Sequence, residues 1–260
     1  MVRIALGVEY DGSRYMGWQR QEHGDTVQGR VEAALSRVAD HPVDVYCAGR
    51  TDAGVHAVGQ VIHFDSAAER TMRSWVLGTN CNLPDDIAIR WAQPMTADFH
   101  ARFSARSRRY RYVIDNRWVR PALHQKRVTW HYHQLDAARM HEAGQALIGE
   151  HDFSSYRALG CQAKHPIRDL YELTVTRSGD FIYLDVHANG FLHHMVRNIA
   201  GVLMAIGQGE RPVNWAAELL GVRDRTLGGV TAPAHGLYFV AAYYDNGVSL
   251  PAPSMPPVFG

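Results

Sequence analysis

The segment that decides this fold reads Cys47-Ala48-Gly49-Arg50-Thr51-Asp52-Ala53-Gly54-Val55-His56-Ala57. It sets an arginine and an aspartate two residues apart, between two glycines. Apolar runs flank it at 43–46 and 58–64, and each run is typical of a β-strand. Glycine adopts backbone angles closed to other residues and lets another molecule approach the main chain closely. The pattern therefore predicts a loop between two strands that presents Asp52 to a bound molecule, beside the positive charge of Arg50.

The elements around this loop follow a β-α-β-β-α-β order. Thr26 is a helix cap, and the apolar residues after it recur at three- and four-residue spacing, as on one face of a helix. Taken in chain order, the pattern predicts a strand at 2–10, a helix from 27, strands at 43–47 and 59–65, a helix at 71–80 and a strand at 87–92.

The same order begins again near residue 108. Tyrosines alternate with arginines along 108–114, which predicts a strand with one aromatic face and one basic edge. The later predicted elements are a helix at 136–148, strands at 170–176 and 181–187, helices at 192–207 and 215–220, and a strand at 237–244. We therefore predict an α+β fold of two βαββαβ (split-βαβ, ferredoxin-like) units, with sheets flanked by helices and a central basic cleft. The expected domains are 1–106 with the Asp52 loop, 107–246, and a proline-rich tail at 247–260.

Composition narrows the class of protein. The 260 residues are 46% hydrophobic and 20% charged, which is typical of a soluble globular protein. The three cysteines are widely spaced and include no C-x-x-C pair, which favours a reducing cytoplasm over a disulfide framework or a thiolate zinc site. No secretory signal is evident near the amino terminus. The most apolar later segment, 191–206, contains His193, His194 and Arg197, so we expect no membrane span there.

Charge is unevenly distributed, although the formal net charge is only +1. Between Arg102 and Arg127 there are nine Lys or Arg residues and one acidic residue, with four aromatic residues interleaved. Basic groups bind phosphates by releasing counterions, and aromatic rings among them stack on unpaired bases. Arg108, Arg109 and Arg111 are then expected to contact RNA phosphates. A solvated basic face is the alternative for this stretch.

Three segments carry a resemblance to a known family. The run 49–57, G-R-T-D-A-G-V-H-A, resembles the signature of the TruA-type transfer RNA pseudouridine synthases, in which the aspartate is the nucleophile, here Asp52. Tyr110 opens a Y-R-Y segment similar to one whose first tyrosine lies against the target base. Arg197 lies in H-H-M-V-R-N, similar to the segment whose arginine pairs with the catalytic aspartate. His193 precedes Arg197 by four residues and is expected on the same helix face.

The resemblance continues through 8–12, 17–19, 98–104 and 236–238, and so covers nearly the whole chain up to about residue 244. It implies a homodimeric enzyme that isomerises uridines at positions 38, 39 and 40 of the anticodon stem-loop of tRNA. The flipped uridine would enter the pocket at an unstacking cost of a few kcal/mol. Arg50 would fill the gap or hold the displaced base. An isomerisation requires no cofactor, so we expect none.

Other functions remain open at this point. An RNA-binding module without catalysis has the same β-α-β-β-α-β order, but the aromatic signature of the RNA recognition motif is not found here. A glycoside or nucleoside hydrolase ordinarily requires a second carboxylate, and none lies beside Asp52 in the sequence. The pairs His131 with His133 and His193 with His194 lack a carboxylate or cysteine at the spacing of a familiar zinc site, so no metal is expected.

Overall fold

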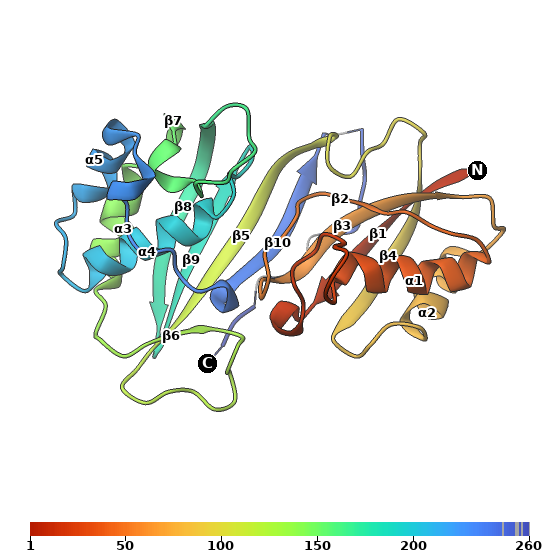
Figure 1. Cartoon of the computed structure of the whole chain (residues 1–260), viewed down its shortest axis with the longest axis horizontal. Coiled ribbons are helices and arrows are strands. Elements are labelled where there is room, and N and C mark those ends of the chain that lie inside the picture. The colour runs from red at the N-terminus through yellow and green to blue at the C-terminus, as the bar shows by residue number, and fades with distance from the viewer. Residues whose placement is uncertain (246, 253–254, 256, 260) are drawn as a thin grey trace. The chain divides into compact units, whose positions relative to one another are not determined.

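The computed structural model describes residues 1–245, 247–252, 255 and 257–259 (Figure 1). It contains two compact units. The first comprises Met1–Arg106 with Tyr238–Pro256, and the second comprises Ser107–Leu237 with Pro257–Gly260. No helix in the described part of the chain is long and apolar enough to cross a bilayer.

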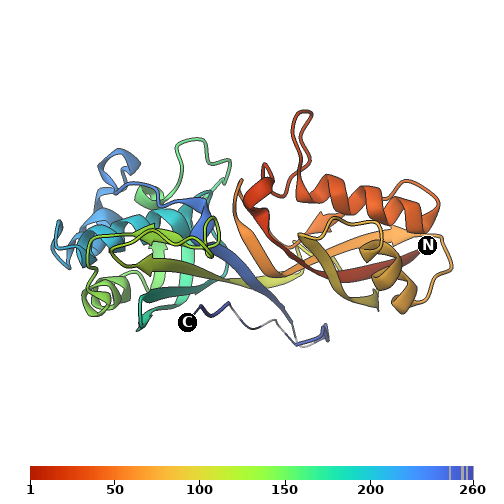
Figure 2. The same cartoon turned by 90° about the horizontal axis from the view of Figure 1, so that it is seen from below.

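The first unit follows the β-α-β-β-α-β order predicted from the sequence. Its elements are β1 (Val2–Tyr10), α1 (Val27–Ala39), β2 (Tyr46–Cys47), β3 (His56–Ser66), α2 (Met72–Asn80) and β4 (Ile87–Met95). β1 lies between β4 and β3 and is antiparallel to both, and β2 pairs with β3. Figure 2 shows α1 lying along this sheet. The strands from the first βαβ part and from the second are thus neighbours in one sheet, as in a split βαβ unit.

The helices of this unit begin at the residues that the sequence indicates. Thr26 accepts a hydrogen bond from Gly29 N, and Thr71 accepts one from Ser74 N, so both threonines satisfy amide groups that a helix start leaves unpaired. The buried Trp75 of α2 packs edge-on against Phe64 of β3, with ring centroids 5.0 Å apart. The predicted apolar faces are therefore the ones that form the core.

Two strand boundaries differ from the prediction. The strand expected at 43–47 is reduced to β2, because the amides of Val43 and Val45 donate to Ser36 Oγ and Glu32 Oε1 on α1 and form no ladder. β3 begins at His56, three residues earlier than expected, because its first residues pair in parallel with β10 (Leu237–Tyr244). This pairing brings residues 238–256 into the first unit, whereas the sequence pattern predicts one domain at 107–246.

The second unit contains more strands than the sequence analysis predicted. Its elements are β5 (Ala105–Asn116), β6 (Thr129–His131), α3 (Ala137–Gln145), β7 (Gly149–Asp152), β8 (Ile167–Ser178), β9 (Phe181–Ala188), α4 (Met195–Gly207) and α5 (Trp215–Val222). The sheet order is β5-β9-β8-β7 with antiparallel neighbours, and β6 lies parallel to β5. The short strands β6 and β7 were not predicted, since three or four residues carry too little periodicity.

The predicted proline-rich tail lies partly outside the described residues, namely at 253, 254, 256 and 260. Within the described part, Pro257 O accepts a hydrogen bond from Arg111, and Phe259 exchanges two hydrogen bonds with the Tyr183 hydroxyl. The end of the tail is thus bonded to the side chains of β5 and β9.

Candidate active site

Asp52 lies in the loop between β2 and β3, as the sequence predicts. Its side chain is half-buried, and Arg50 is exposed. Gly54 has a φ of 79°, in the left-handed region that favours glycine. Gly49 does not have a positive φ, and its backbone is held in another way: Gly49 N donates to Gln60 Oε1 at 3.4 Å, and Gln60 Nε2 donates to Gly49 O at 2.6 Å.

The residues next to Asp52 are bonded to the segment that follows β1. Trp18 N donates to Thr51 O at 3.0 Å, and Gly54 N donates to Tyr15 O at 3.3 Å. The Tyr10 hydroxyl lies 2.8 Å from Thr51 Oγ1 in buried surroundings. The loop therefore does not depend on its own turn alone for its conformation.

His56 closes the loop at the start of β3. Its Nδ1 accepts a hydrogen bond from Gly12 N at 3.1 Å, and its ring stacks on Tyr238 of β10 with centroids 4.7 Å apart. His56 is buried. It is thus held from two sides, by the chain after β1 and by the last strand.

Cys47 precedes the loop and is the nearest alternative nucleophile. Burial raises the pKa of its thiol to about 12, although Arg50 and Arg102 oppose the shift. Since the thiolate is the reactive form, a thiol with so high a pKa is inert at neutral pH. Cys47 is therefore no competitor to Asp52, the residue that the sequence predicts as the nucleophile.

Tyr110 lies on β5 in the second unit and is buried. Its ring meets Phe191 edge-on, with centroids 5.0 Å apart and planes at 82°. An edge-on contact with one neighbour is a favourable arrangement for aromatic rings and fixes the orientation of the tyrosine. The sequence pattern correctly predicts its place on a strand with an aromatic face.

Arg197 lies in the first turn of α4, also in the second unit, and is half-buried. Its Nε donates to Ala232 O at 2.9 Å, and Ala232 N donates back to Arg197 O at 3.1 Å. The guanidinium is thereby bonded to the chain that leads into β10. These contacts come from sequence-distant residues, and no local pattern predicts them.

The expected relation between His193 and Arg197 is wrong. α4 begins at Met195, three residues after the predicted start, because His194 has a φ of 61° and ends the helical backbone on that side. His193 precedes the helix and is exposed, so the two residues do not share a helix face.

The basic stretch is partly neutralised by acids that are distant in the sequence. Arg111 makes two hydrogen bonds to Asp185 at 2.7 and 2.9 Å, and Arg109 pairs with Glu172 at 2.8 Å. The guanidinium of Arg111 also lies 4.9 Å from the centre of the Tyr183 ring. Two of the three arginines of the expected basic edge, Arg109 and Arg111, therefore form cross-strand ion pairs. These pairs favour a role in holding the sheet over the expected contact with phosphates.

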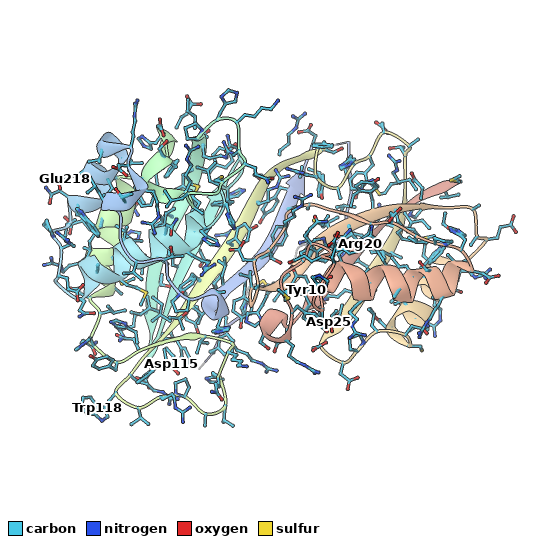
Figure 3. All side chains as sticks on the ribbon, viewed as in Figure 1. Tyr10, Arg20, Asp25, Asp115, Trp118 and Glu218 are labelled. Atoms are coloured by element: carbon cyan, nitrogen blue, oxygen red, sulfur yellow. The ribbon has the colours of Figure 1, made fainter. Side chains whose placement is uncertain are left out.

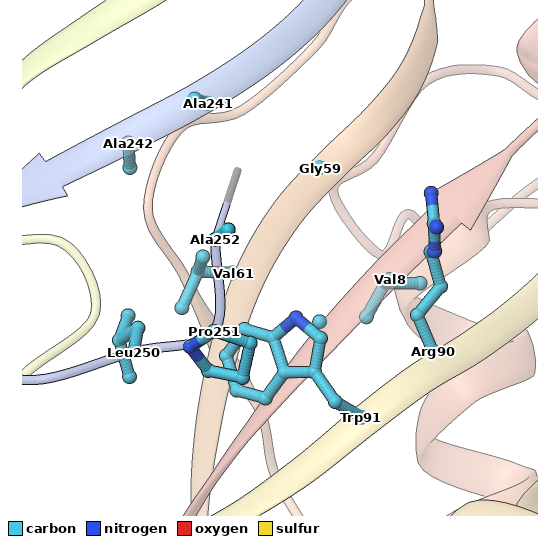
Figure 4. A pocket seen from close by; sticks show the side chains of 11 residues that line it. Val8, Gly59, Val61, Arg90, Trp91, Ala241, Ala242, Leu250, Pro251 and Ala252 are labelled. Atoms are coloured by element: carbon cyan, nitrogen blue, oxygen red, sulfur yellow. The ribbon is translucent and has the colours of Figure 1, made fainter. Parts of the chain in front are cut away.

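A pocket lies elsewhere in the first unit (Figure 4). Its lining is mostly small or apolar and includes Val8, Val61, Trp91 and Leu250, with Arg90 as its ionisable side chain. None of the four predicted site residues lines it. A pocket without convergent polar groups lacks the means for acid–base or nucleophilic chemistry, so we assign it no catalytic role.

Sequence reasoning gave no role to Tyr10, Gln60 or Gly12, which hold the Asp52 loop. The only signal for two of them is the Tyr10-Asp11-Gly12 run, which resembles a family segment but has no chemistry of its own. Gln60 gives no sequence signal, because a single glutamine on a strand is common.

Comparison with known proteins shows which family the chain resembles. The family model described as tRNA pseudouridine synthase matches residues 7–104 and 143–245. A tRNA pseudouridine synthase A of Escherichia fergusonii is 55% identical over 257 residues, which cover 99% of this chain and 95% of the relative. One of Pseudomonas aeruginosa is 57% identical over 258 residues, which cover 99% of this chain and 90% of the relative. The chain belongs to the tRNA pseudouridine synthase family.

Proposed function

We propose that this enzyme isomerises uridine to pseudouridine at positions 38, 39 and 40 of the tRNA anticodon stem-loop, with Asp52 as the nucleophile. The observation that carries the proposal is Asp52 itself: a half-buried carboxylate on a loop whose backbone is bonded on both sides of it. Such a loop keeps the carboxylate in one place before the substrate arrives, which is what a nucleophile requires.

The reaction breaks the bond between uracil N1 and the sugar C1′ and forms a bond between uracil C5 and the same carbon. The hydrogen on C5 is lost and N1 gains one, so atoms and electrons balance without an oxidant or reductant. Asp52 adds to the sugar or to the base in the covalent step, and it leaves when the new bond is complete. We propose that Tyr110 lies against the target base, that Arg197 pairs with Asp52, and that Arg50 holds the displaced base.

We propose the loop 117–128 between β5 and β6 as a contact for RNA. It contains four Lys or Arg residues and no acidic residue. Trp118 is 82% exposed and Leu123 is 89% exposed, and Figure 3 shows Trp118 directed outward from the loop. An exposed aromatic ring among cations fits an unpaired base and its phosphates.

The test is to incubate tRNA with the protein and no added cofactor, and to map pseudouridine in the product. We expect pseudouridine at positions 38–40, and a loss of rate of roughly 10⁴-fold or more in Asp52→Asn and Asp52→Ala, with tRNA binding retained. Asp85→Asn, at an exposed acid outside the site, is the matched control and keeps the rate. An active Asp52→Ala refutes the assignment, and free uracil with abasic RNA indicates a hydrolase.

The resemblance also supports two further proposals, a homodimer and a cytoplasmic location. Light scattering of the purified chain tests the first, since a mass near 29.1 kDa contradicts it and twice that mass supports it. Fractionation of cells that express the chain tests the second.

A further inference from the structure

A buried polar network joins both sides of the Asp52 loop to the sheet of the first unit. The Tyr10 hydroxyl bonds Thr51 Oγ1 and also the Gln60 side chain, and Gln60 bonds both backbone groups of Gly49. All three side chains are buried. Because buried polar groups are costly when unpaired, removing one member of such a network affects the others. The network therefore fixes Gly49 and Thr51 together.

The network is bonded to the loop at two residues that lie just before Asp52, Gly49 and Thr51. Thr51 directly precedes Asp52 in the chain, and Gly49 lies two residues further back. On its other side, Thr51 O accepts from Trp18 N, whose indole ring lies 5.8 Å from the Tyr10 ring. One hydroxyl pair and one amide thus hold Thr51, and the chain continues from it directly to Asp52.

We propose that Tyr10 and Gln60 are positioning residues, which set the place of Asp52 through Thr51 and Gly49. This rests on the proposed function, since it requires that Asp52 be the nucleophile. A reacting group displaced by about 1 Å can lose about 100-fold in rate. Tyr10→Phe removes the hydroxyl and keeps the ring against Trp18, so we expect kcat to fall about 10- to 100-fold while the Kd for tRNA changes less than about twofold.

Thr51 offers a second way to break and restore the same bond. Thr51→Val removes the hydroxyl at nearly constant shape, and we expect the same loss of kcat as in Tyr10→Phe. Thr51→Ser keeps a hydroxyl and should restore most of the rate. Both changes remove the Tyr10–Thr51 bond, and Tyr10→Phe also removes the bond to Gln60. The double variant Tyr10→Phe with Thr51→Val should therefore be little slower than Tyr10→Phe alone.

Tyr156→Phe is the matched control for loss of a buried hydroxyl. Tyr156 is buried and donates to Ala216 O at 2.8 Å, within the second unit. We expect it to lower the melting temperature about as much as Tyr10→Phe does and to leave kcat unchanged. If both variants have a lower melting temperature but only Tyr10→Phe has a lower kcat, Tyr10 is a positioning residue.

Two outcomes separate the failure of this inference from the failure of the proposed function. If Asp52→Ala is inactive and Tyr10→Phe keeps the wild-type kcat, the positioning role is wrong and Asp52 remains the nucleophile. If Asp52→Ala stays active, the nucleophile assignment fails, whatever Tyr10 does. Additive losses in the double variant also contradict the shared bond.

Discussion

The loop 49–55 and the basic stretch 102–127 differ in what surrounds their charged side chains. Asp52 is half-buried on a backbone that is bonded on both sides to the rest of its unit. Arg111 instead reaches an acid on the neighbouring strand β9, and Arg109 reaches across β9 to an acid on β8. The first segment has its backbone hydrogen-bonded around Asp52, and the second uses much of its charge to hold strands together.

This difference shows what can be learned from a sequence motif and what can be learned from a count of charged residues. The G-R-T-D-A-G-V-H-A motif fixes the place of Asp52 in a loop between two strands, although residues outside the motif also hold that loop. A count of Lys and Arg over 102–127 includes no information on partners. Arg106 pairs with Asp245, and Arg117 lies 3.2 Å from the buried carboxylate of Asp115. A net positive stretch is therefore not by itself a phosphate-binding surface.

The largest expected effect concerns the ion pair of Arg111 and Asp185, whose side chains are only 14% and 9% exposed. Asp185→Ala leaves the guanidinium without its carboxylate and should lower the free energy of unfolding by about 3–5 kcal/mol. Chemical denaturation measures this value. The matched control is Asp245→Ala, since the Arg106–Asp245 pair is exposed and its loss should hardly change stability. Equal effects of the two variants would contradict the distinction between buried and exposed pairs.

The second prediction tests the rigidity of the Asp52 loop. Gly17 has a φ of 92°, and a Cβ there would lie 2.7 Å from Thr51 O and 3.0 Å from Asp52 C. Gly17→Ala must therefore move the backbone that carries Asp52, the proposed nucleophile, and we expect kcat to fall about 100-fold.

Gly221→Ala is the control for Gly17→Ala. A Cβ on Gly221 meets no atom within 4 Å, and the residue lies inside α5, where alanine is favoured over glycine. It should keep full activity and gain slightly in stability. A wild-type rate in Gly17→Ala would show that the loop tolerates displacement.

The third prediction compares an exposed arginine of the loop 117–128 with an arginine that is paired to an acid. It uses the salt dependence of tRNA binding. Arg120→Ala in the exposed loop should reduce the slope of log K against log salt by about 0.7–0.9, and Trp118→Ala should raise Kd about tenfold through lost stacking. Arg109→Ala should leave the slope unchanged, because Glu172 already pairs with that arginine. If the salt slope changes only in Arg109→Ala, then Arg109 contacts phosphates and the loop 117–128 does not.

The smallest effect concerns pH and the first unit. Burial lowers the pKa of His63 to about 4 from an ordinary value of 6.5, and His63 Nδ1 accepts from Ala101 N. The unfolded chain then binds a proton that the folded chain does not, so stability falls as pH drops from about 6.5 to about 4.

His63→Asn keeps an acceptor near Ala101 N and removes the titration. The dependence of the urea midpoint on pH should become shallower between those two values. An unchanged dependence would show that His63 contributes nothing to it.

Much of the fold follows from local pattern, and the exceptions share one cause. Thr26 and the apolar spacing after it predict the start of α1, and the range predicted for the second helix, 71–80, differs from α2 by one residue. β2 is short because side chains on α1 accept the amides before it. β3 begins early because it pairs with β10, a strand from the far end of the sequence. α4 begins late because His194 has a left-handed backbone, and no local pattern includes any of these three causes. The site shows the same limit. The sequence motif predicts Asp52, whereas the contacts of Tyr10 and Gln60 with its loop form only when the sheet brings them together.

The parallel pairing of β10 with the start of β3 has a consequence for synthesis on the ribosome. His56 stacks on Tyr238, so the edge that closes the Asp52 loop is provided by a strand translated after the whole of 107–237. The nascent amino-terminal unit therefore stays incomplete until residues 237–244 have been translated. An emerging chain reaches the finished 49–55 loop only after that strand has left the ribosome.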